Sequence, residues 1–497
     1  MKVTRLAAAS AAAMMLGAGG AFAADLDTMP TKAPVYKAPA NTTCTSIVDF
    51  FTTACQLQAY GVRLYGTIDV GASYQTNGAP LDKFFPTGAS YFQQKMNRQS
   101  MFGWGPNGLS QSNVGVQVTE PLGAGWKFVG QWDFGFDPVT GQFANGPGSL
   151  TDQFGKLNNG TNQTTNADSG RNGTWYNGQL FAGVSNDTWG TLTVGRQNSL
   201  TLDGVNAYDP MGGAYAFSPI GFSGKVPGGG NTEDTRYNES VKYRVNLPAN
   251  FRFGAIVEYG GTDLGNGASE AFELSGGADF HVGPGVFSFD VIGGYMKDAV
   301  NLGLHQTGGV VDGLQATISD NTNVMLLAKY TVDKLKLSAG YEWVGYRPGS
   351  DCNSAAIGGA CRGGDFGSGS IMDNANTGFN PVGVFVNQKA LDFQVVWAGA
   401  RYSITDSLEV AAAYYRYMNG QDATNPVGCT SATSFNPAIS GSCAGTMNAA
   451  SVMLDWKFAP KWDTYIGTFY SANAGGLGSG FLSKDNVATT AGIRFRF

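Results

Sequence analysis

The sequence predicts an all-β fold, a transmembrane antiparallel β-barrel of sixteen strands, from three observations. Segments of about ten residues alternate between apolar and polar side chains. Short and long connections between these segments follow one another in turn along the chain. No stretch after the N-terminal region has the ~18 consecutive apolar residues of a membrane-spanning helix. A barrel of eighteen strands is the alternative.

Composition argues against several other classes of protein. The chain has 497 residues, of which 14% are charged and 12% aromatic, and its formal net charge is −6. The acidic balance argues against a nucleic-acid binder, and the aromatic content argues against a disordered chain. His281 and His305 are the two histidines of the sequence, which leaves little for histidine-based catalysis or a His-rich metal site. We therefore expect no enzyme activity, no metal and no cofactor.

The first 23 residues predict a secretory signal peptide. Lys2 and Arg5 give a positive start, and residues 6–20 are apolar and small. Residues 21–23, with the sequence Ala-Phe-Ala, match the small-residue pattern of a cleavage site. A transmembrane anchor is the weaker interpretation, because the apolar run is short and rich in small residues.

Residues 24–61 are expected to form a periplasmic extension ahead of the barrel. Residues 24–43 are rich in Pro, Ala and Lys without periodicity, which is typical of an extended linker. Residues 47–60 could form one short amphipathic helix held by Cys44 and Cys55.

The six cysteines fall into three local pairs, which are Cys44 with Cys55, Cys352 with Cys361, and Cys429 with Cys443. Six cysteines allow fifteen pairings, but short separations in an exported chain favour these three disulfides. Free thiols are the alternative. A zinc site is disfavoured because the sequence has no C-x-x-C motif and no histidine near the cysteines.

Residues 62–497 are assigned to the barrel. In residues 62–74 one face is apolar and the other polar, and residues 487–497 repeat this alternation at the C-terminus. Fourteen further runs start near Asn113, Trp126, Gln179, Gly190, Glu239, Phe251, Ala271, Val286, Asn323, Leu335, Leu391, Leu408, Ala449 and Trp462. Together these runs give sixteen strands.

The connections sort strictly by length. Seven short ones alternate with eight long ones, a pattern typical of outer-membrane barrels with short periplasmic turns and long external loops. A soluble β-sandwich also alternates, but it has no reason to sort its loops in this way. Aromatic residues that would form an interfacial girdle stand beside the short turns, at Trp126, Trp189, Phe251, Phe458 and Trp462. Ordinary strand-end aromatics are the alternative interpretation.

The polar face of the strands is expected to line a water-filled lumen. Inward positions by parity are Arg63, Asp69, Lys127, Gln131, Asp133, Lys242, Arg244, Arg252, Glu258, Glu273, Asp279, Lys329, Lys336, Glu342 and Arg494. Charges of both signs on one wall are costly unless they are hydrated, and sixteen strands enclose an aqueous channel. The expected function is passive diffusion of ions and small hydrophilic solutes.

The third long connection, residues 197–238, is the candidate for a pore constriction. It carries the acids Asp203, Asp209, Glu233 and Asp234, while Arg196 precedes it and Arg236, near its end, opens the next strand, with Lys242 and Arg244 further along that strand. Loop acids that face arginines across the lumen would create a transverse field. A solvated surface loop with incidental charge is the alternative.

Several segments resemble those of the Gram-negative general diffusion porins. They are Leu-Tyr-Gly-Thr-Ile-Asp at 64–69, Trp-Gly-Thr-Leu-Thr-Val-Gly-Arg-Gln at 189–197, Arg-Tyr-Asn-Glu-Ser-Val-Lys-Tyr at 236–243, and the terminal Phe497. Residues 24–34 resemble the mature start of alphaproteobacterial outer-membrane porins. The resemblance implies a homotrimer in the outer membrane of a Gram-negative bacterium, in contact with lipid and lipopolysaccharide. It also implies that the third loop folds into each pore and faces basic wall residues.

Arg196 and Arg236 match arginines around that family's constriction, and Asp203 and Asp209 fall where the family places loop acids. The sequence departs from the family at residues 112–113 and 178–179, where many relatives carry a wall arginine. The basic cluster is therefore expected to be thinner, which leaves ion selectivity open.

Three rival functions remain at this stage. An eighteen-stranded sugar channel would need an aromatic slide, for which inward Tyr65, Tyr415 and Tyr417 are too few. An outer-membrane enzyme would need a partner for His281. A plugged barrel acting as an adhesin or structural anchor would show no conductance.

Overall fold

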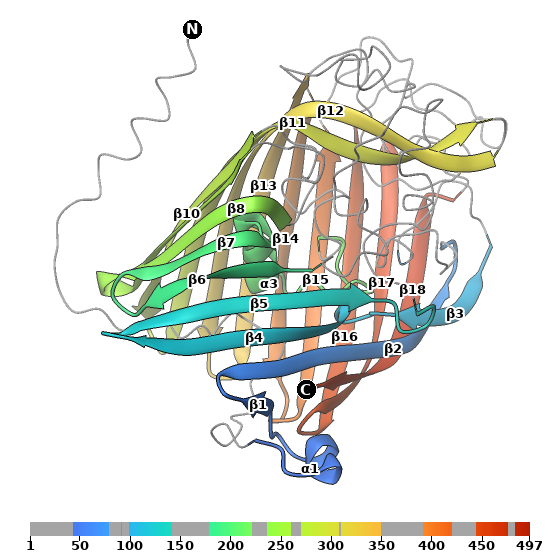
Figure 1. Cartoon of the computed structure of the whole chain (residues 1–497). Coiled ribbons are helices and arrows are strands. Elements are labelled where there is room, and N and C mark those ends of the chain that lie inside the picture. The colour runs from blue at the N-terminus through green and yellow to red at the C-terminus, as the bar shows by residue number, and fades with distance from the viewer. Residues whose placement is uncertain are drawn as a thin grey trace, which may run out of the picture.

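The computed structural model describes residues 43–78, 91, 99–141, 178–220, 236–259, 270–307, 310–348, 391–419, 444–475 and 483–497. In these residues the chain forms a large antiparallel barrel, with a small N-terminal element at one end (Figure 1). The remaining residues, which include Cys352, Cys361, Cys429 and Cys443 as well as Glu233 and Asp234, lie outside the described part of the chain.

Sixteen strands close the barrel. They are β2 (Val62–Gln75), β4 (Ser112–Gly123), β5 (Trp126–Phe136), β6 (Leu180–Asn186), β7 (Gly190–Asn198), β8 (Arg236–Leu247), β9 (Phe251–Tyr259), β10 (Glu270–Val282), β11 (Gly285–Thr307), β12 (Val310–Val332), β13 (Leu335–Pro348), β14 (Leu391–Ser403), β15 (Leu408–Asn419), β16 (Gly445–Ala459), β17 (Trp462–Gly475) and β18 (Asp485–Arg496). Each strand pairs with the next one along the chain, and β18 pairs with β2, where Arg494 lies opposite Asp69. The prediction of sixteen strands is confirmed.

Two short strands add to β2. Strand β1 (Leu57–Ala59) pairs with the start of β2, and β3 (Met101–Pro106) pairs with its upper half, at residues 70–75. Strand β4 takes only the lower half of β2, at residues 62–67. The first long connection therefore contributes strand structure that the sequence pattern did not predict.

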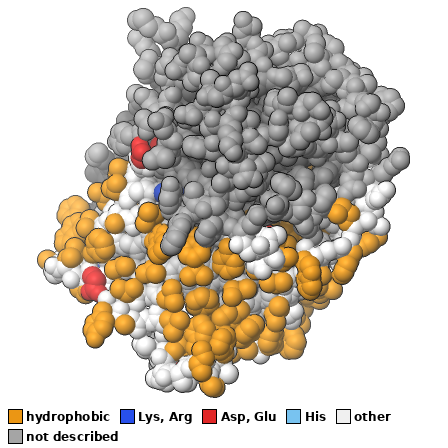
Figure 2. Space-filling model, turned by 45° about the vertical axis from the view of Figure 1, so that its right-hand side comes forward, with side chains coloured by type: hydrophobic (Ala, Val, Ile, Leu, Met, Phe, Trp, Pro, Cys, Tyr) orange, Lys and Arg blue, Asp and Glu red, His pale blue; other side chains and the backbone are white. Residues whose placement is uncertain are grey.

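The outer face of the barrel is apolar. Side chains at one parity of each strand are exposed, as on β2 at Leu64 and Ile68 and on β12 at Val324 and Leu326. Figure 2 shows hydrophobic side chains gathered over the lower side of the molecule. This surface is expected where strands face lipid, because alternate residues of a barrel strand point outward.

The predicted short turns are all present. They join β4 to β5, β6 to β7, β8 to β9, β10 to β11, β12 to β13, β14 to β15 and β16 to β17. Of the predicted girdle, Trp126, Trp189, Phe251 and Phe458 are exposed beside these turns. One predicted long connection, between the runs that start near Val286 and Asn323, differs: residues 297–307 and 310–322 extend β11 and β12 into a long hairpin with two register shifts. The alternation Val300, Leu302, Leu304 continues there, which explains the extra strand length.

A helix-bearing loop fills part of the barrel interior. Helix α3 (Leu200–Tyr208) follows β7, and the chain continues inside the barrel to Ile220. Figure 1 shows α3 within the ring of strands. We call residues 199–220 the inner loop. No helix among the described residues has both the length and the apolar character to cross a membrane.

Candidate functional site

The inner loop begins with a capped helix. Ser199 is the N-cap of α3, and its hydroxyl accepts a hydrogen bond from the Leu202 N–H at 3.0 Å. Gly204 makes a close approach to the wall, because a Cβ at this position would lie 2.6 Å from Ile292 and 2.8 Å from Leu327. Helix α3 therefore packs directly onto β11 and β12.

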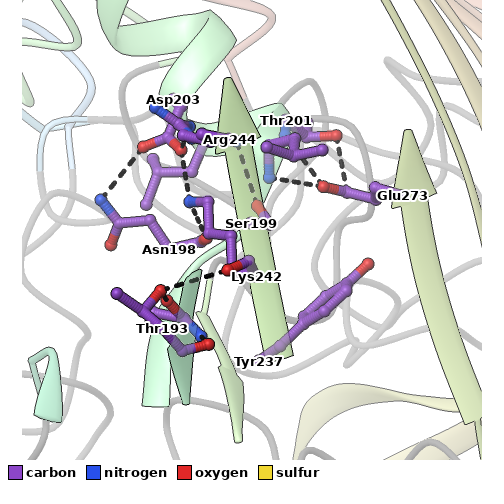
Figure 3. Close-up of polar contacts among 12 residues, drawn as sticks. Thr193, Asn198, Ser199, Thr201, Asp203, Tyr237, Lys242, Arg244 and Glu273 are labelled. Carbon is purple, nitrogen blue, oxygen red and sulfur yellow. Dashed lines mark hydrogen bonds and ion pairs between the residues drawn. The ribbon is translucent and has the colours of Figure 1, made fainter. Parts of the chain in front are cut away.

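Glu273 of β10 holds the N-terminus of α3. Its carboxylate accepts hydrogen bonds from the backbone N–H of Leu200 at 2.5 Å, from the backbone N–H of Thr201 at 3.1 Å, and from the Thr201 hydroxyl at 2.8 Å (Figure 3). The side chain of Glu273 is fully buried. A negative charge is favourable here, because the first N–H groups of a helix are unpaired and carry partial positive charge.

Asp203 of α3 forms a direct ion pair with β8. Its carboxylate contacts the Lys242 Nζ at 2.6 Å and the Arg244 guanidinium, and it also accepts from the Asn198 amide at 3.4 Å (Figure 3). Lys242 also donates to the Asn198 carbonyl at 2.7 Å. The expectation that this acid faces basic residues across the lumen is corrected. Strand β8 lies directly beside the start of the loop, so the charges meet without a gap.

The C-terminal end of α3 joins a second polar cluster. The Tyr208 hydroxyl donates to Asp290 and accepts from Arg252 at 3.0 Å. Arg252 also forms ion pairs with Asp290 at 2.8 Å and Asp279 at 2.7 Å, and Lys329 lies 4.9 Å from the centre of the Tyr208 ring. Both ends of α3 are therefore tied to the wall through charged groups.

Asp209 stabilises the turn after α3. It accepts from the backbone N–H groups of Met211 at 3.1 Å and Gly213 at 2.5 Å, and from the Tyr415 hydroxyl of β15 at 2.6 Å. Its side chain is buried. The sequence predicts Asp209 at the constriction, and the structure shows that its carboxylate holds the loop against the wall.

The last part of the inner loop packs on β16 and β17. The Phe217 ring lies 6.1 Å from the Tyr465 ring, and the Ser451 hydroxyl donates to the Phe217 carbonyl at 2.6 Å. The Ala216 N–H donates to the Gly108 carbonyl at 2.9 Å, close to β4. The inner loop thus runs along the inner surface of the wall from β7 round to β17. We call the wall from β9 to β17 the covered wall.

The covered wall carries apolar side chains where the sequence predicts a polar lumen. Inward residues that are almost fully buried there include Ile256, Ile292, Met325, Leu327, Val395, Trp397, Tyr415, Met453 and Phe469. On β12 the outward residues Val324 and Leu326 are apolar as well. Strands of the covered wall such as β12 thus have apolar residues on both faces, and this pattern in the sequence could have predicted the contact with the inner loop.

The opposite part of the wall, on β2, β4 and β5, carries a polar ladder. Arg63 donates to Gln117, Gln117 donates to Gln131 at 3.1 Å, and Gln131 donates to Asp133 at 2.8 Å. The Tyr65 hydroxyl also donates to Asp133, at 2.8 Å. All five side chains are partly exposed. The polar ladder is a surface that water and small solutes can contact.

The other predicted lining residues have varied surroundings. Arg196 is buried and donates to the carbonyls of Gly178 at 2.9 Å and Arg236 at 3.3 Å. Asp69 is fully buried, accepts from the Leu109 N–H at 2.8 Å and from the Tyr465 hydroxyl at 2.6 Å, and thus anchors a loop rather than lining open water. Lys127 is exposed near a short turn and lies 3.5 Å from Asp187.

The predicted disulfide between Cys44 and Cys55 is confirmed, and the other two predicted pairs lie outside the described residues. The helix expected over residues 47–60 is shorter than predicted. It is α1 (Ile47–Thr52), and the chain then returns through Cys55 to β1. Among the described residues, no group of three or more His, Cys, Asp and Glu is placed to hold a metal ion.

Comparisons with known proteins agree on one family. The family described as Gram-negative porin matches residues 7–476 of the chain. An outer membrane porin protein of Bordetella pertussis is 27% identical over 218 residues, which are 43% of this chain and 46% of that protein. The match thus spans about half the length of this curated relative.

Solved structures of low sequence identity share the fold. An anion-selective porin from Comamonas acidovorans has a TM-score of 0.53 at 15% identity, covering 88% of this chain and 99% of its own. OmpT, an outer membrane protein of Vibrio cholerae, has a TM-score of 0.51 at 14% identity, covering 89% of this chain and 99% of its own.

Proposed function

Because the chain belongs to the Gram-negative porin family, we propose that it forms a water-filled channel in the outer membrane, through which ions and small hydrophilic solutes diffuse passively. One observation carries the proposal: inside a closed sixteen-stranded barrel, the polar ladder remains partly exposed opposite the inner loop. A barrel of this size is wide enough for an aqueous passage even when a loop occupies one side. The chemistry of the ladder suits hydrated solutes, since amide and guanidinium groups exchange hydrogen bonds with water.

The constriction of this channel lies, in our proposal, between the inner loop and the polar ladder. Arg244, whose side chain is 37% exposed, stands on the loop side, and Arg63 stands on the ladder side. Asp203 is bonded to Lys242 as well as Arg244, so the group carries an excess of positive charge. Local charge of this kind biases which ions enter.

We further propose that the barrel assembles as a homotrimer in contact with lipid and lipopolysaccharide, and that it acts as a channel rather than an enzyme. The continuous apolar outer face supports the contact with lipid. His281, the histidine that an enzyme would have used, is exposed beside the β10–β11 turn.

Planar-bilayer recording of the purified, detergent-folded protein under a salt gradient tests the proposal. We expect stepwise insertions in groups of three and a nearly linear current–voltage relation. The sign of the reversal potential supplies the selectivity. A correctly folded barrel without conductance would overturn the channel and favour a plugged anchoring protein. Saturable block of the current by one solute would favour a substrate-specific channel instead.

A further inference from the structure

The N-terminal residues 43–61 form a compact element at the short-turn end of the barrel. We call this element the N-terminal clip (Figure 1). The disulfide between Cys44 and Cys55 closes it, and β1 joins it to β2. Ser46 caps α1 by accepting from the Asp49 N–H at 3.0 Å. A six-residue helix is marginal by itself, so the disulfide and the cap are what keep it folded.

Asp49 adds a second tie within the clip. Its carboxylate accepts from the Thr45 N–H at 2.9 Å and from the Thr53 hydroxyl at 2.8 Å. These two hydrogen bonds hold the pKa of the exposed Asp49 carboxyl below its usual value. The only charged side chain of α1 is therefore bonded within the clip.

The clip packs on the outer surface of the barrel. On β18, Arg494 points inward to Asp463, whereas Ile493, Phe495 and the following Phe497 share the outward parity. The Phe50 ring of α1 lies 5.6 Å from Phe495 and 5.4 Å from Phe497. Because Phe495 and Phe497 have the parity of the apolar outer face, α1 sits on that face.

Gly66 explains how the seam accommodates this contact. The backbone of Gly66 pairs with Phe497, with an N–O distance of 3.0 Å in both directions. A Cβ on Gly66 would lie 2.5 Å from the Phe497 ring. The absence of a side chain at Gly66 leaves room for the Phe497 ring at the junction of β2 and β18, where Phe50 packs against it.

Two further contacts fix α1 beside the β16–β17 turn. The Lys461 Nζ donates to the Phe50 carbonyl at 2.8 Å and lies 4.4 Å from the centre of the Phe50 ring. The Trp462 indole N–H donates to the Phe51 carbonyl at 3.2 Å. Trp462 belongs to the aromatic residues beside the short turns, which mark the interface between hydrocarbon and water.

The outward side of α1 is apolar and exposed. The exposed fractions are 69% for Ile47, 67% for Val48 and 43% for Phe51. These side chains continue the apolar outer face below Val62 and Leu64 of β2, which are also exposed. The apolar face of α1 thus lies at the level where an interfacial helix buries its apolar side chains.

We propose that the N-terminal clip is a membrane-interface anchor, in which Ile47, Val48 and Phe51 insert into the boundary between headgroups and acyl chains of the inner leaflet. Three side chains are too few for a stable contact with a second copy, which buries about 800 Å² per partner. Lipid needs no such complementary surface. The inference rests on the outer-membrane placement proposed above.

Spin labelling tests the proposal in the full chain reconstituted in phosphatidylethanolamine and phosphatidylglycerol vesicles. Nitroxides are placed separately at Val48→Cys in the clip, Ile493→Cys on the outer face, and Asp406→Cys in the β14–β15 turn. All three native side chains are exposed, so the variants should fold. The wild-type protein is treated with the label first, to establish that its own cysteines take none. Accessibility to oxygen and to a neutral nickel chelate is then compared.

We expect the labels at positions 48 and 493 to favour oxygen, and the label at position 406 to favour the nickel chelate. The label at position 48 should lie within about 5–10 Å of the headgroup boundary. If the labels at positions 48 and 406 behave alike while position 493 favours oxygen, the anchor is wrong and the barrel placement stands. If position 493 also favours the chelate, the membrane placement itself fails. If the label at position 48 is shielded from both reagents only in the oligomer, a second copy of the chain covers the clip. That result overturns the proposal.

Discussion

The covered wall and the wall that carries the polar ladder have similar outer faces and different inner faces. On β2 the outward residues Leu64 and Ile68 are exposed and apolar, and on β12 Val324 and Leu326 are the same. Inward, β2 and its neighbours present the polar ladder, whereas the covered wall presents apolar side chains such as Leu327. The strands have the same geometry, so the difference comes from what lies against them.

This difference shows that the polarity of the inward residues depends on whether the inner loop or water lies against them. A polar group that loses water without gaining a partner costs free energy, so positions under the inner loop are apolar or individually bonded. Glu273 and Asp209 illustrate the bonded class, because each accepts three hydrogen bonds. Ladder side chains retain partial contact with water and need no such complete pairing.

Placing a charge on the covered wall should have the largest effect. Leu327 is fully buried beneath α3, and Asp at this position is too short to reach water. We expect Leu327→Asp to lower the free energy of unfolding by about 3 kcal/mol or more, because the carboxylate would be buried without a partner. Urea unfolding of the folded barrel measures this loss. Leu327→Met conserves the volume and should cost less than about 1.5 kcal/mol. Equal stabilities for the two variants would contradict the contact with α3.

Removing the Glu273 carboxylate, which holds the N-terminus of α3, should have the next largest effect. Glu273→Ala leaves three buried donors of Leu200 and Thr201 without acceptors, which costs free energy until the loop opens and water reaches them. The hydrogen bonds between the barrel strands do not depend on this contact, so the inner loop should loosen while the barrel remains closed. We expect a larger and noisier single-channel current. Glu273→Gln keeps one acceptor oxygen, so its single-channel current should lie between those of Glu273→Ala and the wild type. If the current of Glu273→Ala were identical to that of the wild type, the Glu273 carboxylate would not be what holds the loop.

These two variants also separate what the sequence predicts from what it does not. Strand starts at Val62, Trp126 and Leu335 follow from alternation and short turns, and the structure reproduces them. The inward placement of Glu273 was predicted as well. Its role was not, because its partners are backbone N–H groups 72 and 73 residues away, which no local pattern reports.

The charge cluster was predicted in part. The sequence grouped Asp203 with Lys242 and Arg244 but placed the acid across the lumen from the basic residues, because loop length alone does not say where an acid lies. In the structure Asp203 belongs to the first turn of α3, which lies next to β8, so its carboxylate contacts Lys242 and Arg244 directly. The covered wall was missed although Met325 and Leu327 were visible as apolar residues at inward positions.

Neutralising Asp203 should shift the ion selectivity of the channel. Asp203→Asn leaves Lys242 and Arg244 without their shared carboxylate and raises the local positive charge by one. A single charge about 10 Å from a passing ion in water contributes ~0.4 kcal/mol, or about a twofold change in permeability ratio. The reversal potential under a salt gradient should therefore move toward anions. Asp187→Asn, at an exposed turn, serves as the control and should leave the potential unchanged. A shift of equal size in both variants would assign the effect to total charge instead of the cluster.

Adding a charge to the polar ladder should have the smallest structural effect. Gln117 lies between Arg63 and Gln131 and is partly exposed, so Gln117→Lys can keep its ammonium in water. We expect unfolding in urea to change by no more than about 1 kcal/mol, because the ammonium loses the Arg63 hydrogen bond and faces a like charge that water partly screens, in contrast to Leu327→Asp on the covered wall. The reversal potential should move toward anions, since the new charge lines the passage. Lys127→Gln, at the exposed rim, should leave both quantities as they are. If Gln117→Lys lowered stability as much as Leu327→Asp, the ladder would be buried, and the open passage would have to lie elsewhere in the barrel.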